Sequence, residues 1–269
     1  MNRSAFFRWA LLAASALLRG QLSIPQLGVA RYADGSVHLI RGVAANLIVD
    51  SRAIATSADG VSFADSAGLL SARGVIRLIR TDGSVLVEYQ STEPLPVLNI
   101  DPFAQSAAAW LPSKHLLLRW NGRQFVETPI DDSSFSGRVT FVSVVSSKAA
   151  QFYVARADSS VARIAVSLPS GNVISVDTAP GARGRAFMQQ GWILWQDGAS
   201  LAGERPNGFR QTVALSQQPL PPADLAMERM SDHWLHVSSR STGTDWAVYL
   251  SATQLNVFLL PTPVAEVVR

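Results

Sequence analysis

Residues 138–177 read RVTFVSVVSSKAAQFYVARADSSVARIAVSLPSGNVISVD. Polar and turn-forming residues break this stretch at positions 146–148, 158–160 and 169–172. The four short runs between the breaks are rich in valine and isoleucine or carry aromatic residues, which favours strands. The first run is apolar on both faces, as a strand covered on both sides must be, whereas the later runs include polar residues. The stretch therefore predicts four antiparallel strands, the first buried and the last facing water.

Turn signals of the kind found in this stretch recur along the chain. They are Asp34-Gly35, Asp82-Gly83, Asn121-Gly122, Asp158-Ser159, Asp197-Gly198 and Thr242-Gly243, at intervals of 48, 39, 37, 39 and 45 residues. Periods of ~40–50 residues with several strands each are typical of β-propeller blades. We interpret each turn as the middle hairpin of one blade and expect an all-β fold, a single β-propeller of six blades. The longer intervals after Asp34 and before Thr242 leave five or seven blades as alternatives.

Residues 153–176 contain a Tyr-Val strand, an Asp-Ser turn, a short strand ending near a Gly-Asn turn, and a Val-rich strand. This order resembles the repeat of the Tyr-Val-Thr-Asn class of surface and secreted propellers. The resemblance covers one blade, and the other repeats depart from the pattern. It implies the propeller fold and brings no catalytic residue with it.

The second and third repeats are less regular. In the second we expect strands at residues 61–64, 69–80, 84–89 and 97–100, with a β-bulge at Arg73-Gly74. In the third we expect strands at residues 107–111, 115–120 and 124–130, and no fourth strand is visible.

The first repeat has strand-like runs at residues 27–32, 36–41 and 46–49 but no clear inner strand. Residues 264–268 form a strand-like tail with no blade of its own. We therefore expect this C-terminal strand to complete the first blade and close the ring, because closure removes unpaired strand edges.

Residues 1–20 have the features of a signal peptide, with Arg3 and Arg8 before an apolar core at residues 9–18. Ten apolar residues are too few to span a bilayer, which needs ~20, although a retained N-terminal anchor is the alternative. We expect removal of this leader on export and a propeller domain over residues 21–269, periplasmic or secreted. The cleavage position stays open.

Removal of the leader also changes the charge. The chain has 23 basic and 20 acidic residues, and the leader holds three arginines and no acidic residue, so 23 − 3 = 20 of each sign remain. A balanced charge argues against a nucleic-acid partner. The absence of cysteine excludes disulfides, cysteine nucleophiles and thiolate metal sites.

No metal or cofactor site is expected from the remaining residue pattern. His233 and His236 lie three residues apart on a predicted strand and so point to opposite faces, while His38 and His115 belong to other blades. The chain has no phosphate-binding glycine loop followed by lysine and no nucleophile elbow.

Two groups of residues invite a catalytic or sugar-binding interpretation. Asp131-Asp132 is an adjacent acidic pair that could serve glycoside hydrolysis, but a solvated loop is the commoner setting. Aromatic residues are expected to pack the blades rather than form a sugar platform: Tyr153, Trp110, Trp120, Trp192, Trp195, Trp234 and Trp246.

We therefore predict no catalytic residues and leave the binding residues open. The favoured function is an exported, non-catalytic binding propeller, monomeric, for a protein or glycan ligand. The alternative is a hydrolase, lactonase-like or a glycosidase, whose site is assembled from several blades. Three or more carboxylates or histidines converging at the channel mouth would favour the enzyme, and a mouth lined by Ser, Ala, Gln and scattered Arg would favour binding.

Overall fold

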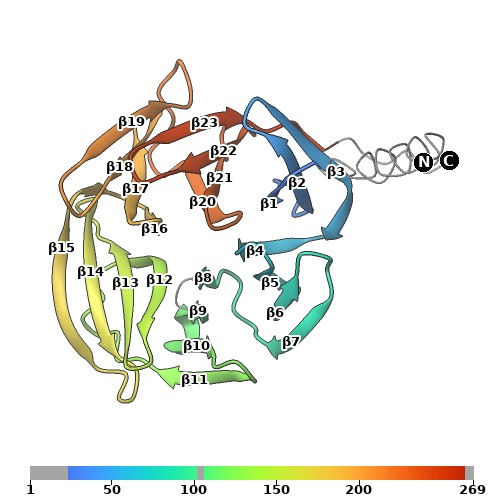
Figure 1. Ribbon diagram of the computed structural model, residues 1–269. Coiled ribbons are helices and arrows are strands. Elements are labelled where there is room, and N and C mark those ends of the chain that lie inside the picture. The colour runs from blue at the N-terminus through green and yellow to red at the C-terminus, as the bar shows by residue number, and fades with distance from the viewer. Residues whose placement is uncertain (1–23, 102–105, 264–269) are drawn as a thin grey trace, which may run out of the picture.

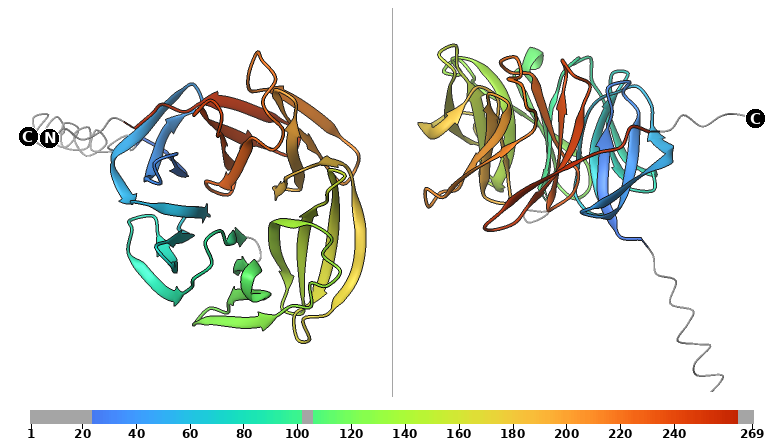
Figure 2. Two further views of the ribbon diagram at one scale, coloured as in Figure 1. Left: turned by 180° about the vertical axis from the view of Figure 1, so that it is seen from behind. Right: turned by 90° about the horizontal axis from the view of Figure 1, so that it is seen from above.

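The computed structural model describes residues 24–101 and 106–263. It arranges them as six antiparallel sheets in a ring around a central axis (Figure 1). Views from behind and from above show the sheets standing side by side around that axis (Figure 2). The chain is thus a six-bladed β-propeller, as the turn spacing predicted. Along the described ranges, no helix is long and apolar enough to cross a membrane.

The blades follow one another along the chain. Blade 1 contains β1 (Gln26–Arg31), β2 (Val37–Val43) and β3 (Asn46–Ala55); blade 2 contains β4 (Ala58–Phe63), β5 (Ala67–Ala72), β6 (Val75–Arg80) and β7 (Val85–Gln90); blade 3 contains β8 (Val97–Asp101), β9 (Ser106–Leu111), β10 (Leu116–Trp120) and β11 (Phe125–Pro129). Blade 4 contains β12 (Arg138–Ser146), β13 (Ala149–Ala155), β14 (Ser160–Ser167) and β15 (Val173–Arg183); blade 5 contains β16 (Ala186–Gln189), β17 (Trp192–Asp197), β18 (Ser200–Glu204) and β19 (Arg210–Ala214); blade 6 contains β20 (Leu225–Arg229), β21 (Trp234–Ser239), β22 (Asp245–Leu250) and β23 (Leu255–Leu259).

Blade 4 confirms the four-strand pattern predicted for residues 138–177. On β12, Val139, Phe141 and Val142 are buried. On β15, the outermost strand, Ile174 and Val176 are 62% and 44% exposed. The gradient from a buried first strand to a solvated last strand is therefore present.

The six turn signals lie in six different blades, but not at equivalent positions. In blades 4, 5 and 6 they join the second strand to the third, as predicted, whereas Asp82-Gly83 joins β6 to β7 and Asn121-Gly122 joins β10 to β11. The assignment of these two as middle hairpins was wrong, although the blade number was right.

Arg73-Gly74 is the middle turn of blade 2 and not a bulge. Both residues have positive φ, 50° and 77°, as the two-residue turns that favour hairpins require. Residues 69–80 are therefore two paired strands, β5 and β6. As a consequence, Val97–Asp101 is not the outer strand of blade 2 but β8, the strand missing from the predicted blade 3.

Strand β1 runs in the opposite direction to the first strands of the other blades. The starts of β4, β8, β12, β16 and β20 gather at one end of the axis, where they meet Arg31 at the end of β1. Because strands alternate in direction across an antiparallel sheet, blade 1 contains the equivalents of the second, third and fourth strands. This agrees with the prediction that the first repeat lacks an inner strand. Residues 264–268, proposed to complete it, lie outside the described residues.

Hydrogen bonds close the seam between the first and last blades within the described residues. They are Val29 N to Met230 O (3.0 Å), Ser231 Oγ to Leu27 O (2.6 Å) and Tyr32 Oη to Pro261 O (3.0 Å). A further hydrogen bond, from Asp232 N to Asp65 Oδ1 (3.2 Å), reaches from blade 6 to blade 2, and β20 lies beside β4. The ring is therefore closed by backbone and side-chain contacts around β1.

Candidate functional site

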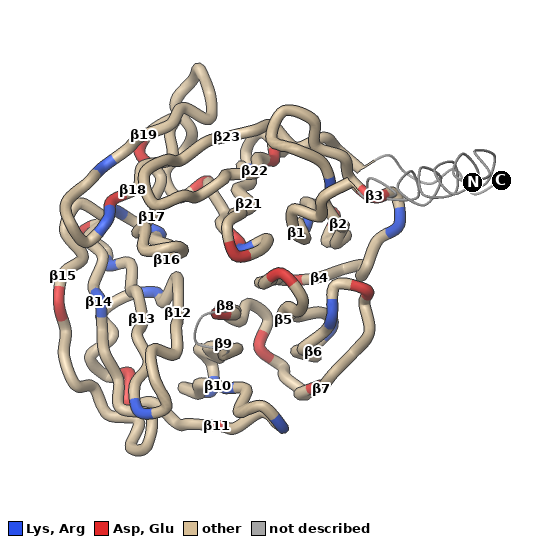
Figure 3. Tube along the Cα trace, in the orientation of Figure 1, with Lys and Arg blue, Asp and Glu red and all other residues tan. Residues whose placement is uncertain are grey.

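Charged residues stand on the innermost strands around the ring axis (Figure 3). At one end of the axis, residues from all six blades surround a cavity of ≈ 160 Å³. We call this end the arginine mouth, defined by Arg31, Arg138, Arg185 and Arg240. We call the opposite end the carboxylate mouth, defined by Asp65, Asp101, Asp232 and Arg229.

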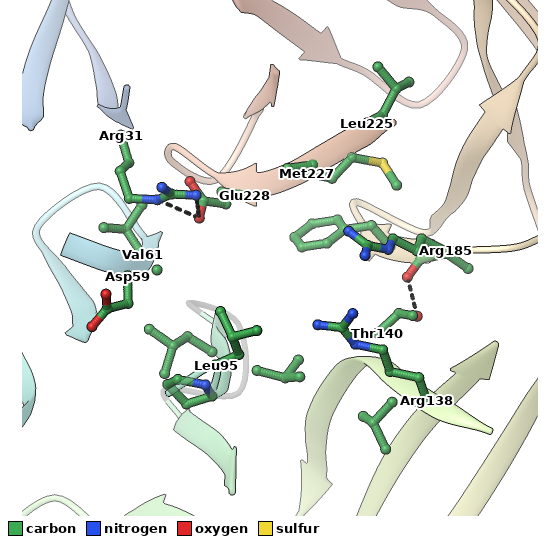
Figure 4. Close-up of a pocket in the computed structure, with 18 of the residues that line it drawn as sticks. Arg31, Asp59, Val61, Leu95, Arg138, Thr140, Arg185, Leu225, Met227 and Glu228 are labelled. Carbon is green, nitrogen blue, oxygen red and sulfur yellow. Dashed lines mark hydrogen bonds and ion pairs between the residues drawn. The ribbon is translucent and has the colours of Figure 1, made fainter. Parts of the chain in front are cut away.

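The strand starts position two of these arginines. Arg138 is the first residue of β12, and Arg185 directly precedes β16. Thr140 Oγ1 donates a hydrogen bond to Ala186 O (2.8 Å), which ties β12 to β16 between the two arginines. Figure 4 shows the guanidinium groups of Arg138 and Arg185 close to each other at one side of the cavity. Arg240, directly after β21, lines the same cavity.

Arg31 is paired with Glu228 on the opposite side of the cavity (Figure 4). Its Nε and Nη2 atoms both lie 2.9 Å from Glu228 Oε1. Burial by itself raises the pKa of Glu228, but the hydrogen bonds and charges of His236 and Arg31 outweigh burial and hold that pKa below its ordinary value. Glu228 is therefore ionised, and its charge is balanced by groups of the protein.

Arg138 and Arg185 lack such a partner, whereas the charge of Arg240 interacts with the carboxylate of Asp224. Among the described residues, the ion pairs within 4.0 Å include none made by Arg138, Arg185 or Arg240. Burial lowers the pKa of Arg185, and the positive charges of Arg240 and Arg138 lower it further. Asp59, which is exposed, is the remaining carboxylate of this lining. The field at this mouth is therefore positive.

Apolar side chains form the rest of the arginine mouth. They include Val61, Leu95, Val97, Leu98, Val139, Phe187, Leu225 and Met227. In the described part of the chain this lining contains no histidine, serine or tyrosine, and the Thr140 hydroxyl already donates to Ala186. An arginine side chain does not deprotonate in proteins, so the arginines can bind a ligand but cannot act as a base; the carboxylates of this lining are Glu228, which Arg31 engages, and the exposed Asp59.

The carboxylate mouth surrounds Arg229, which is only 5% exposed. Burial lowers the pKa of Arg229, and the charges of Asp101 and Asp232 oppose that shift. Burial, and then the charge of Asp65, raises the pKa of Asp232. Asp65 Oδ1 accepts a hydrogen bond from the Asp232 backbone rather than from its carboxyl group. No group of three or more His, Cys, Asp or Glu in the described ranges is arranged to hold a metal ion.

The four histidines occupy separate settings. His38 Nδ1 lies 2.7 Å from Asp50 O, His115 Nδ1 2.8 Å from Asp132 Oδ1, His233 Nδ1 3.3 Å from Leu250 O, and His236 Nε2 2.8 Å from Asp245 Oδ1. His236 is on β21 and is buried, whereas His233 directly precedes β21 and is exposed, so the prediction that both stand on one strand was wrong for His233.

The acidic pair Asp131-Asp132 and the aromatic residues named in the sequence analysis are not among the residues that define either mouth. Asp131 Oδ1 accepts a hydrogen bond from Ser133 N, and Asp132 bonds to His115 at the blade 3 hairpin. Most of the aromatic residues named above are buried: Trp110, Trp192, Trp195, Trp234, Trp246 and Tyr153. Their role is packing, for example where Trp110 of blade 3 meets Phe152 of blade 4 edge to face at 5.3 Å.

Sequence reasoning identified no member of the arginine mouth as a functional residue. The available signal was positional, because Arg138 and Arg185 each stand at the start of an innermost strand in successive blades. Arg31 and Arg240 stand at other points of their blades, so their convergence needed the ring geometry.

The chain matches no protein-family model and no curated protein. Solved structures similar to it include the β-propeller domain of Cps50 (Swd1) from Myceliophteria thermophila, with 12% identity, 89% of this chain and 88% of that chain covered, and a TM-score of 0.48. Hsv2 from Kluyveromyces lactis has 12% identity and a TM-score of 0.44, with 76% of this chain covered but only 63%, less than two thirds, of that chain. A candidate 6-phosphogluconolactonase from Bacteroides uniformis has 15% identity, coverage of 88% and 82%, and a TM-score of 0.44. At these values no functional assignment follows, and the Tyr-Val-Thr-Asn resemblance of residues 153–176 rests on its residues alone.

Proposed function

We propose that this chain is an exported, non-catalytic binding propeller whose ligand, a group of a protein or glycan, occupies the arginine mouth. The observation that carries the proposal is the lining of this cavity. All six blades contribute to it, it combines unpaired guanidinium groups with apolar walls, and its described lining residues include no serine, histidine or tyrosine.

Gly60 allows a direct test of the place of binding. It lines the cavity, has no left-handed φ, and an added Cβ would meet only Leu98 Cδ1, at 3.8 Å. A Cβ at position 60 is therefore accommodated, and Gly60→Leu is the variant chosen to place aliphatic carbons in the lining of the mouth. Ligands found by a thermal-shift screen of the unmodified protein should lose binding to this variant while its melting temperature is retained. Ligands that bind both proteins equally would place the site elsewhere.

The absence of catalysis needs a separate measurement. The purified protein should be assayed on lactone, glycan and ester substrates, with and without divalent metal ions. Turnover that a single Asp or His substitution abolishes would overturn the proposal of a non-catalytic protein.

A hydrolase is the second candidate, and one observation favours it. At the carboxylate mouth, burial and the neighbouring charge of Asp65 raise the pKa of Asp232, and a carboxyl group with a raised pKa is what a general acid needs. The substitutions Asp232→Asn and Asp65→Asn are therefore the ones to apply if turnover is found. Loss of turnover in both would assign the reaction to this end of the axis.

Export is proposed from residues 1–20 alone. The test is N-terminal sequencing of the protein recovered outside the cytoplasm. A start near residue 21 would support a cleaved leader, and an intact Met1 in the cytosolic fraction would contradict it.

A further inference from the structure

We infer that the group held at the arginine mouth is an oxyanion, a carboxylate or a phosphate, attached to a small apolar body. This inference rests on the proposed function, because it names the chemistry of the ligand at that same site. The juxtaposition that carries it is a set of arginines from successive blades beside an aliphatic wall.

The cavity has more arginines than carboxylates in its lining. Of the two carboxylates that line it, Glu228 is engaged by Arg31 through both Nε and Nη2. Asp59 is exposed and makes no ion pair within 4.0 Å among the described residues. Arg138 and Arg185 are thus left facing one cavity without a carboxylate against either of them.

The positive charges of these arginines destabilise one another. Like charges brought together in a partly buried site repel each other, and the environment of Arg185 disfavours its charged form because of burial, Arg240 and Arg138, in that order. An anion placed between the guanidinium groups would remove the repulsion. Guanidinium groups bind carboxylate and phosphate oxygens with two parallel hydrogen bonds, so an oxyanion is the favoured occupant.

The volume and the apolar lining of the cavity indicate what the ligand carries besides its oxyanion. A volume of ≈ 160 Å³ holds one side-chain-sized group rather than an extended chain. Among the aliphatic residues of this lining, Leu95 is 56% exposed and Met227 is partly buried. Covering such aliphatic surface favours an apolar body over a second charge.

The test uses three probes on the unmodified protein: hexanoate, its neutral isostere hexanamide, and inorganic phosphate. Binding is followed by calorimetry and by the Nε–Hε resonances of the arginines, assigned through their loss in Arg138→Gln and Arg185→Gln. Hexanoate should bind at least tenfold more tightly than hexanamide and should shift both resonances. Phosphate should shift the same resonances with weaker binding, because it lacks the apolar body; tighter binding of phosphate would overturn the aliphatic part of the inference.

Variants separate this site from general surface attraction. Arg185→Gln and Arg138→Gln should each weaken hexanoate binding about tenfold or more. Arg163→Gln is the matched control, because Arg163 is paired with Asp177 on the outer strands of blade 4 at 3.5 Å, and it should change the affinity less than twofold. Arg185→Lys keeps the charge without the planar fork and should fall between the wild type and Arg185→Gln. If Arg185→Gln does not fold, Arg185→Lys and Arg138→Gln still decide the question.

The outcomes distinguish this inference from the proposed function. If a neutral ligand binds, is lost in Gly60→Leu and is unaffected by the arginine variants, the mouth is a binding site but the oxyanion assignment is wrong. Equal weakening by Arg163→Gln would show only non-specific attraction of anions and would also overturn the assignment. Turnover of a substrate would instead contradict the proposed function.

Discussion

Gly28 offers the sharpest test of how the ring closes. This residue of β1 has φ +150°, and a Cβ added to it would lie 2.7 Å from the Met230 carbonyl carbon and 2.9 Å from the Met230 Cβ. The next residue, Val29, donates its N–H to Met230 O at 3.0 Å. Gly28→Ala therefore forces β1 and the end of β20 apart at the hydrogen bond that joins the first and last blades.

Two costs add up in this variant. A non-glycine residue held at such a φ costs about 1–3 kcal/mol. Loss of the hydrogen bond at Met230 costs about 0.5–1.5 kcal/mol. A total of about 3 kcal/mol corresponds to a decrease of about 6–12 °C in the melting temperature of a domain of this size.

The assay is differential scanning calorimetry of the Gly28→Ala and Gly60→Ala variants beside the unmodified protein. Gly60 is the matched control, because it lies on an innermost strand, has no left-handed φ, and its added Cβ would have a single ordinary contact at 3.8 Å. Gly60→Ala should melt at the wild-type temperature or slightly above it. If the two variants melt at the same temperature, the seam at Met230 does not contribute to ring stability as argued.

Two further predictions concern the same seam. Burial lowers the pKa of His236, but the hydrogen bonds and charges of Asp245 and Glu228 outweigh burial and raise that pKa. The stabilisation that protonated His236 gives the fold is therefore complete below about pH 6.5 and is lost as the pH rises through the raised pKa. The pKa of Glu228 is lowered, so the stabilisation that ionised Glu228 gives the fold is present above about pH 4.5 and is lost on acidification. The free energy of unfolding, measured across pH, should therefore be greatest between about pH 4.5 and pH 6.5. The variant His236→Gln should remove the decline on the alkaline side. Deletion of residues 261–269 removes the carbonyl oxygen of Pro261 that accepts the Tyr32 hydrogen bond, together with the tail proposed to complete blade 1. The deletion should therefore lower the melting temperature or cause aggregation. An unchanged melting temperature would contradict closure of the ring by the C-terminal tail.

The blade that could be predicted best is the one with the plainest local signals. In blade 4, polar breaks separate every pair of strands, and the first strand, apolar on both faces, is mostly buried, although Ile174 and Val176 of the last strand are exposed. Local propensity, turn chemistry and burial agree there, so little tertiary information was needed. The number of blades followed from the turn signals spaced 37–48 residues apart, one of which lies in each blade.

The errors in blades 2 and 3 arose where a turn is made by residues that do not favour it strongly. Arg73 adopts φ 50° in the middle turn of blade 2, and His115 adopts the same φ at the hairpin of blade 3. Neither residue predicts a turn from its side chain, whereas Asp82-Gly83 nearby does. Asp82-Gly83 was therefore predicted to be the middle turn of blade 2, where the structure has Arg73-Gly74. The predicted strand boundaries of blades 2 and 3 were wrong as a consequence.

The arginine mouth could not be predicted, because its residues are brought together only by closure of the ring. Arg31 and Glu228 are 197 positions apart in the chain, and their pairing depends on β1 lying against blade 6. The same pair leaves Arg138 and Arg185 without a carboxylate on the far side of the cavity. The Arg31–Glu228 contact thus contributes both to the seam and to the charge of the mouth, so replacement of Glu228 should loosen the seam and change what the mouth can bind. Measurements on Gly28→Ala, which perturbs the seam without altering a charge, separate the two effects: a weaker seam with unchanged affinity for an anion would show that the arginines of blades 4 and 5 are sufficient for binding.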